Sequence, residues 1–281
     1  MSDHIDPAKL DRLAEVAVRT GVNLQPGQDL VITAPMAALD LVRRITVHAY
    51  KAGAGIVTPF FNDDAITLAR YEHAPDESFD RAPEWLFEGM AAAFKGGAAR
   101  MAITGDDPML LAEQDPKKVA RLSKATSIAA KPAMNPIVGF EVNWNIVAYP
   151  GAAWAAKVYP DLPVDEAQGK LMDAIYAASR LDGDDPVANW AEHTATLKER
   201  VNWLNDQDFA ELHYTGPGTD LHLGLADGHI WKGGASPALN GVVCQPNIPT
   251  EEVFTCPHAY KVEGTVAATK PLAHQGNVIE D

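Results

Sequence analysis

Short apolar segments alternate with helical segments through the first half of the chain, and this alternation restricts the fold more than any other feature. The apolar segments have the length of strands and lie at 30–33, 54–61, 99–105 and 140–150. Helical patterns fill the intervals, at 6–21, 37–52, 63–71, 82–94 and 115–133. Apolar strands that alternate with helices are typical of a parallel sheet covered by helices on both faces. We therefore expect an α/β fold of Rossmann-like or flavodoxin-like layout here.

Two further changes of pattern divide the rest of the chain. Residues 164–208 are almost wholly helical and predict two helices joined by a short acidic loop. From about 209 the pattern is strand-like and interrupted by Gly and Pro, and the pair Asp227-Gly228 predicts the tight turn of a hairpin. We therefore expect an α/β N-terminal domain at 1–207 and a second, mixed α+β domain that begins within 208–281.

The chain lacks the sequence marks of several common ligand classes. No GxGxxG follows the first strand, where the turn reads APMAALD, so a dinucleotide site of the usual kind is not expected. The formal net charge of −15 is unlike the basic surface that binds nucleic acid. The polar start and the lack of an apolar run of about 18 residues give no sign of a secretion signal or a membrane span. Cys244 and Cys256 match no zinc or redox spacing, and a reducing cytoplasm is the expected location.

Two adjacent acids in the segment NIPTEEVFTCP are the main candidates for a functional role. If the segment is a strand, neighbours point to opposite faces, so only one of Glu251 and Glu252 can face a given metal ion. Glu252 would then share a face with Phe254, and Glu251 would share one with Val253. The alternative is a helix start, with Thr250 as N-cap and both acids favoured by the helix dipole. The residues alone leave these interpretations open, together with that of an exposed acid pair.

Several polar and aromatic residues near the two acids are weaker candidates. His222 shares the polar face of a predicted strand with Asp220, but no zinc-type spacing surrounds it, which favours a solvent-facing histidine. Asp220 is expected to hold backbone groups of a loop. Trp231 is interpreted as a packing or interface residue. Lys232 and Lys270 could each face a substrate carboxylate or simply lie on the surface, and the sequence leaves their roles open.

Five motifs occur along the chain in the order YPGAAWAAKVYPDLP, GPGTDLHLGL, HIWKGG, PNIPTEEVFTCP and VEGTVAATKPL. These motifs and their order resemble the thermophilic metallo-aminopeptidases of the aminopeptidase S and T type. The resemblance implies an α/β N-terminal domain, a C-terminal catalytic domain and a homodimer. It also implies a hydrolase that uses two divalent metal ions, such as zinc, cobalt or magnesium, to remove N-terminal amino acids from peptide substrates.

The resemblance assigns one metal ligand within these residues. The second glutamate of TEEVFT is a ligand in the family, and it corresponds to Glu252 here, which leaves Glu251 in solvent or supporting a ligand. The other ligands and the general base are expected downstream of Asp281. We therefore expect an N-terminal portion with an incomplete catalytic domain, inactive alone, with metal absent or weakly bound. The alternative is a truncated, non-catalytic paralogue that acts as a peptide- or partner-binding module.

Overall fold

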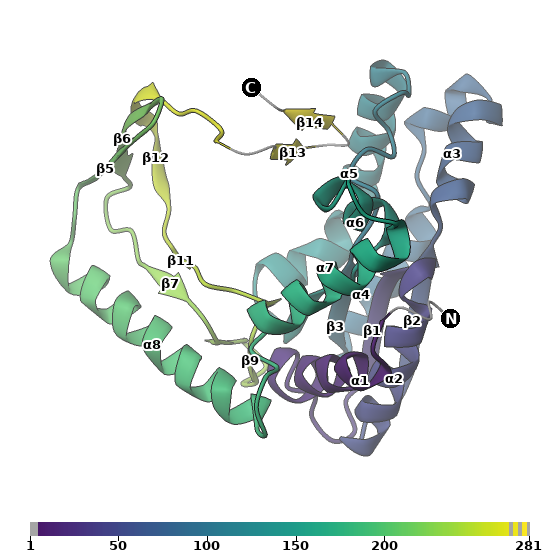
Figure 1. Ribbon diagram of the computed structural model, residues 1–281, viewed down its shortest axis with the longest axis horizontal. Helices are drawn as coiled ribbons and strands as arrows, with labels where there is room; N and C mark the ends of the chain where they lie inside the picture. Colours follow the sequence, from purple (N-terminus) through teal and green to yellow (C-terminus); the bar gives the residue numbers. More distant parts are fainter. Residues whose placement is uncertain (1–4, 270–271, 275–276, 280–281) are drawn as a thin grey trace.

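The computed structural model, which describes residues 5–269, 272–274 and 277–279, contains a five-stranded parallel sheet (Figure 1). The strand order is β10-β4-β3-β1-β2, and each neighbouring pair is parallel. The strands are β1 Leu30–Pro35, β2 Val57–Asn62, β3 Ala99–Thr104, β4 Trp144–Ala148 and β10 Asn247–Ile248. The predicted α/β fold is therefore confirmed.

Helices cover both faces of this sheet. The α-helices are α1 Pro7–Val16, α2 Leu39–Lys51, α3 Asp64–His73, α4 Glu84–Lys95, α5 Pro116–Val138, α6 Ala152–Val158, α7 Val164–Ala178 and α8 Pro186–Gln207. Strand β1 shows why helices must cover both faces of the sheet, because its alternate side chains point into two different hydrophobic cores. Leu30 and Ile32 pack in a core built with α1, α2, α6 and α7, while Val31 packs in a second core with α4 and α5.

Local sequence signals set the helix boundaries. The side chain of Asp6 accepts a hydrogen bond from the backbone amide of Ala8 at 2.8 Å, and Pro7 occupies the first helical position of α1. A π-helical turn, Ala17–Gly21, continues α1 and ends at the predicted glycine. Asp185 caps α8 in the same way, accepting from the amide of Ala188 at 3.0 Å. The predicted helix starts at these two Asp-Pro pairs are confirmed.

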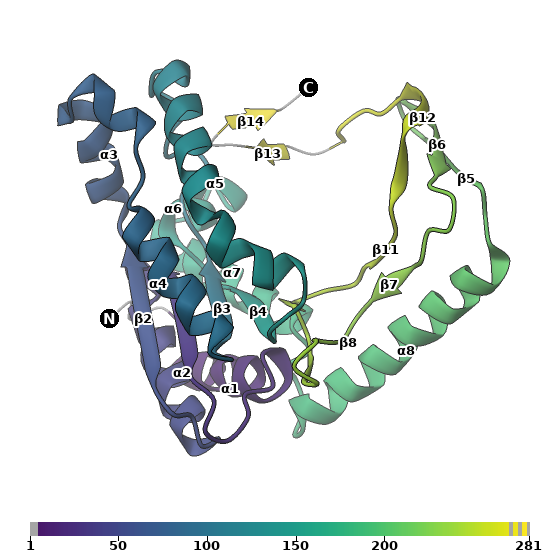
Figure 2. The ribbon, with the colours of Figure 1, turned by 180° about the vertical axis from the view of Figure 1, so that it is seen from behind.

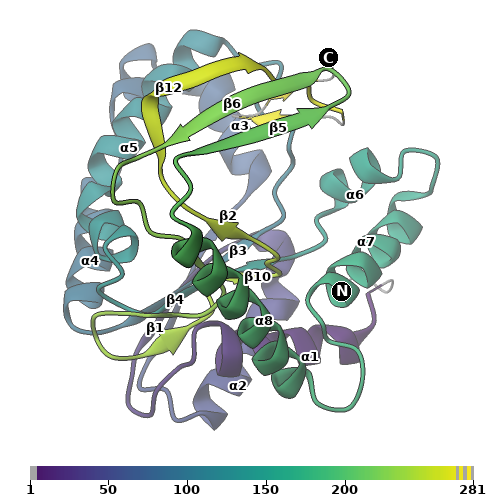
Figure 3. The same ribbon diagram turned by 90° about the vertical axis from the view of Figure 1, so that its left-hand side faces the viewer.

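Apart from β10, the strands that follow α8 in the chain form small antiparallel sheets (Figures 2 and 3). A three-stranded sheet has the order β12-β6-β5, formed by β12 Pro257–Thr265, β6 Thr219–Leu225 and β5 Glu211–Gly216. The other pairs are β7 Lys232–Gly233 with β11 Val253–Phe254, β8 Ser236–Pro237 with β9 Val243–Cys244, and β13 Leu272–His274 with β14 Asn277–Ile279. The views show α8 leading away from the parallel sheet toward β5, with β7 and β11 beside it.

The prediction of a hairpin at Asp227-Gly228 is wrong. A turn does form there, since the amide of His229 donates to the carbonyl of Ala226 at 3.0 Å, but the strands that flank this turn do not pair. Strand β6 pairs instead with β5 and β12, so both of its edges are already occupied. The chain after the turn is held along α8, because Asn205 forms hydrogen bonds with the amide and carbonyl of Trp231. Turn propensity fixed the local reversal but not the strand partner.

Strand β10 connects the two predicted domains. It lies at the edge of the parallel sheet beside β4, although its residues belong to the predicted second domain. The buried amide of Asn145 donates to the carbonyl of Gln245 at 2.7 Å, and the amide of Gln245 donates to the carbonyl of Gly21 at 2.7 Å. The boundary at 207 stays a prediction, and the chain beyond it completes the first sheet. Within the described ranges, no helix is long and apolar enough to cross a membrane.

Candidate functional site

A cleft of about 510 Å³ lies where β3, β4 and β10 end. Its walls include Thr104 and Ala148, the last residues of β3 and β4, and the chain that follows β10 through Glu251 and Glu252. Ligands of open parallel α/β sheets bind beyond the carboxyl ends of the strands. The two candidate acids therefore lie at the edge of the sheet where a ligand is expected.

Close backbone packing shapes this edge of the sheet. A Cβ atom added to Gly151 would lie 1.8 Å from the carbonyl oxygen of Gly105, and one added to Gly105 would lie 2.2 Å from the carbonyl oxygen of Tyr149. The amide of Tyr149 also donates to the carbonyl of Thr104 at 2.7 Å. The glycine in the motif YPGAAW is therefore required because two backbone segments touch there.

The segment that carries the two acids is fixed at both ends. Before it, β10 pairs with β4, the Ile248–Pro249 peptide is cis, and the carbonyl of Thr250 lies 2.8 Å from Nε2 of His193. After it, Val253 of β11 pairs with Gly233 of β7. This pairing brings the motifs HIWKGG and TEEVFT side by side.

Neither local structure considered for the two acids forms. Glu251 and Glu252 precede β11 and lie in no strand, and no helix begins at Thr250. The helix-start alternative is therefore wrong, although the amide of Glu252 lies 3.5 Å from Oγ1 of Thr250, as in a cap. The orientations of the two acids follow from their contacts rather than from strand alternation.

Glu251 is held by one side chain that follows α7 and one that lies in α8. Its Oε1 lies 2.5 Å from Nη2 of Arg180, just after α7, and its Oε2 lies 3.8 Å from Nε2 of His193 in α8. Arg180 is itself positioned over the ring of the buried Trp190, at 5.9 Å from the ring centroid. Because the Glu251 side chain is 65% exposed, this ion pair adds little stability and chiefly fixes the orientation of the carboxylate.

Glu252 differs, because its carboxylate has no partner among the described residues. Neither an ion pair nor a side-chain hydrogen bond reaches it, and the residue is exposed at the cleft. Its backbone is held against β7, since the next residue, Val253, pairs with Gly233, and the carbonyl oxygen of Glu252 lies 2.7 Å from where a Cβ atom of Gly233 would be. A free carboxylate on a fixed backbone is available to a divalent cation.

The donors near Glu252 make up only part of a metal site. Across the described ranges, one cluster brings three potential ligand side chains together, formed by His213, Asp220 and His222, and Glu252 is not in it. A metal centre needs three or four protein ligands. The described residues therefore supply only one ligand side chain at the cleft. The assignment of Glu252 as that ligand stays a prediction.

The weaker candidates lie away from the cleft or outside the described residues. Trp231 is buried, as the packing interpretation predicts, and Lys232 is exposed on β7 opposite Phe254. Asp220 does not hold loop backbone, because its carboxylate accepts from Nε2 of His213 at 2.7 Å. Lys270 lies outside the described residues.

His222 is solvent-facing, as predicted, but it also has a defined partner. Its Nδ1 lies 2.7 Å from a carboxylate oxygen of Glu211, and this hydrogen bond raises the pKa of the imidazole. The hydrogen bond from His213 lowers the pKa of Asp220. Sequence reasoning gave no site role to His213, because no zinc-type spacing surrounds it, or to Arg180 and His193; all three reach their partners through the fold. A hairpin folded about the GPGT turn would have revealed His213.

Residues 6–281 match the family described as thermophilic metalloprotease (M29), and the chain belongs to this family. It is 48% identical over 271 residues to aminopeptidase T of Thermus thermophilus and 43% identical over 272 residues to aminopeptidase 2 of Geobacillus stearothermophilus. These alignments cover 96% and 97% of this chain.

A solved structure supports the fold directly. Wild-type AmpT from Thermus thermophilus superposes with a TM-score of 0.90 at 46% identity, covering 97% of this chain and 67% of that chain. The chain spans 66% of the length of aminopeptidase T and of aminopeptidase 2. The resemblance found from the motifs is therefore confirmed for the family and the fold.

Proposed function

We propose that this chain belongs to a metal-dependent aminopeptidase that removes N-terminal amino acids from peptides with two divalent metal ions. Membership of the metalloprotease family supports metal-dependent hydrolysis. The names of two relatives, aminopeptidase T and aminopeptidase 2, support cleavage at the amino terminus of a peptide. The natural ions are proposed to be zinc, cobalt or magnesium, acting in a homodimer in the cytoplasm.

The unpartnered carboxylate of Glu252 is the structural observation that best supports metal binding at the cleft. We assign it to hold one of the ions, because it is exposed at the cleft and no cation among the described residues neutralises it. Bound divalent ions of this kind supply a Lewis acid and lower the pKa of water toward about 7. Glu251 has a different role, because Arg180 fixes it beside the cleft.

The residues of this chain act by positioning rather than by moving a proton. Strand β10 and the β7–β11 pair hold the backbone of Glu252 on both sides, so its carboxylate is presented with little freedom. The other ligands and the general base are proposed to lie outside residues 1–281. In this account, 1–207 form the N-terminal domain and 208–281 begin the catalytic domain.

Hydrolysis of leucine p-nitroanilide tests the proposal. The protein translated from the complete gene should release p-nitroaniline when cobalt is added, and EDTA should abolish this activity. Residues 1–281 alone should not turn over, because they supply one ligand of the site. No hydrolysis by the complete protein, with peptide binding retained, would favour the binding module, and EDTA-sensitive turnover by residues 1–281 would contradict the incomplete ligand set.

A further inference from the structure

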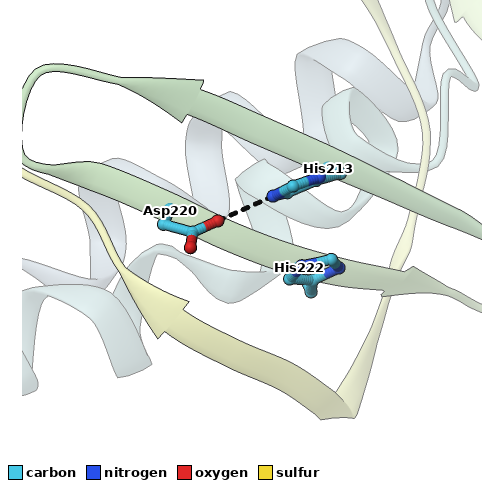
Figure 4. A group of neighbouring side chains, drawn as sticks. All are labelled: His213, Asp220 and His222. Carbon is cyan, nitrogen blue, oxygen red and sulfur yellow. Dashed lines mark hydrogen bonds and ion pairs between the residues drawn. The ribbon is translucent and has the colours of Figure 1, made fainter.

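We propose that the β5–β6 hairpin carries a binding site for a divalent transition-metal ion of the zinc class, formed by His213, Asp220 and His222 (Figure 4). This site shares no residue with the cleft that contains Glu252. It therefore does not rest on the proposed peptidase activity.

The register of the hairpin places all three side chains on one face. His213 lies directly opposite His222, and Asp220 is two residues before His222 on the same strand. Residues two apart on a strand point to the same side, and directly opposed residues share a face. The two imidazole rings accordingly stack, with centroids 3.9 Å apart and planes inclined by 16°.

The donor atoms lie near the separations that one shared ion requires. One ligand atom from each residue lies within 4.8 Å of the others, and Nε2 of His213 is 2.7 Å from Oδ1 of Asp220. Ligands at about 2.0–2.2 Å from a tetrahedral zinc ion lie about 3.3 Å from each other. Rotation of exposed side chains is therefore enough to reach coordination distances, without a change in the hairpin backbone.

Glu211 prepares His222 for the role of a ligand. Its carboxylate accepts from Nδ1 of His222 at 2.7 Å, which places the proton on Nδ1 and leaves Nε2 able to bind a metal ion. Metal-binding histidines commonly donate their other ring nitrogen to a carboxylate in this way. The contact selects the tautomer whose Nε2 can bind a metal ion.

The surrounding charges also favour a cation. Glu263 of β12 lies opposite His222 across the other edge of β6, so a third carboxylate joins Glu211 and Asp220 on this face. The ammonium group of Lys261, on β12, is directed to Asp227 at 4.0 Å. Imidazole nitrogens with a carboxylate suit zinc, nickel and copper better than magnesium or calcium.

The site is open to solvent, and the expected ligand set is two histidines, one aspartate and water. The side chains of His213 and His222 are each 45% exposed, so an ion can reach them without opening the fold. An ion held by both strands would also link β5 to β6. The proposed consequence is a hairpin stabilised by metal.

Isothermal titration calorimetry with zinc tests the proposal on residues 1–281 that carry the substitution Glu252→Gln. This substitution removes the ligand assigned at the cleft, so that zinc binding there does not contribute. We expect one zinc ion per chain, at least ~10-fold weaker binding after His213→Gln or His222→Gln, and unchanged binding after His73→Gln. His73 is a matched control, since it is exposed on α3 far along the chain.

A second measurement protects the test against a folding defect. Asp220→Asn replaces one ligand with a side chain of the same size at an exposed position, and should also weaken zinc binding while the circular dichroism spectrum is unchanged. Zinc should shift the ring proton resonances of His213 and His222 before those of the other histidines. Absence of zinc binding by the Glu252→Gln background, or an equal affinity when His222→Gln or Asp220→Asn is added to it, would overturn the proposal.

Discussion

Substitution of Gly151 by alanine should destabilise the protein strongly. The new methyl group would lie 1.8 Å from the carbonyl oxygen of Gly105, whereas real Cβ atoms essentially never approach a neighbour within 3.0 Å. That neighbour is backbone, so the end of β3 and the start of α6 must separate by roughly 1 Å or more. Overpacking of this kind lowers the free energy of unfolding by about 1–3 kcal/mol. Because the contact is with backbone, which cannot turn away, we expect the upper end, about 3 kcal/mol.

Thermal unfolding followed by circular dichroism measures this effect. For a chain of this size, about 3 kcal/mol lowers Tm by roughly 6–12 °C. Gly89→Ala is the matched control, because Gly89 is exposed within α4 and nothing lies within 4 Å of its added Cβ. The control should gain about 0.5–1 kcal/mol from helix propensity. If Gly151→Ala melts within about 2 °C of wild type, the packing argument is refuted.

Two further predictions address the cysteines and the docking of β10. Iodoacetamide at pH 8 should label the exposed Cys256 before Cys244. Cys244 is buried, and burial raises the pKa of its thiol, which leaves less of the reactive thiolate. Equal labelling of both cysteines, measured by mass spectrometry, would contradict this prediction. Asn145→Ala should lower the free energy of unfolding by about 2–3 kcal/mol in urea titrations, because a buried carbonyl loses its donor; a loss below about 0.5 kcal/mol would show that this bond does not hold β10 in place.

Much of the fold follows from local signals in the sequence. The parallel sheet follows from apolar segments that alternate with helices, and the starts of α1 and α8 follow from Asp-Pro pairs whose caps the structure shows. Strand β10 could not be predicted this way, because two residues carry no periodicity and its pairing depends on contacts made 100 residues away. The turn at Asp227-Gly228 illustrates the same limit, since the strand partner is chosen by tertiary packing.

The candidate site divides in a similar manner. Glu252 could be chosen from the motif, and the resemblance named a role for it. The contacts that distinguish Glu251 from Glu252 could not be predicted. Arg180 and His193 come from other parts of the chain and meet Glu251 only in the folded protein. The cluster of His213, Asp220 and His222 could be predicted only in part from the sequence. Its members are spaced by a hairpin turn rather than by a local zinc motif.

The difference between Glu251 and Glu252 is the central claim, and paired substitution in the protein translated from the complete gene tests it most directly. We expect Glu252→Gln to lower kcat/KM by about 1,000-fold or more, equal to about 4 kcal/mol of transition-state stabilisation, and to reduce the metal content measured by mass spectrometry. Glu251→Gln should retain the metal and lose less than about tenfold in kcat/KM. Equal losses of activity and metal in both variants, or a greater loss in Glu251→Gln, would contradict the account.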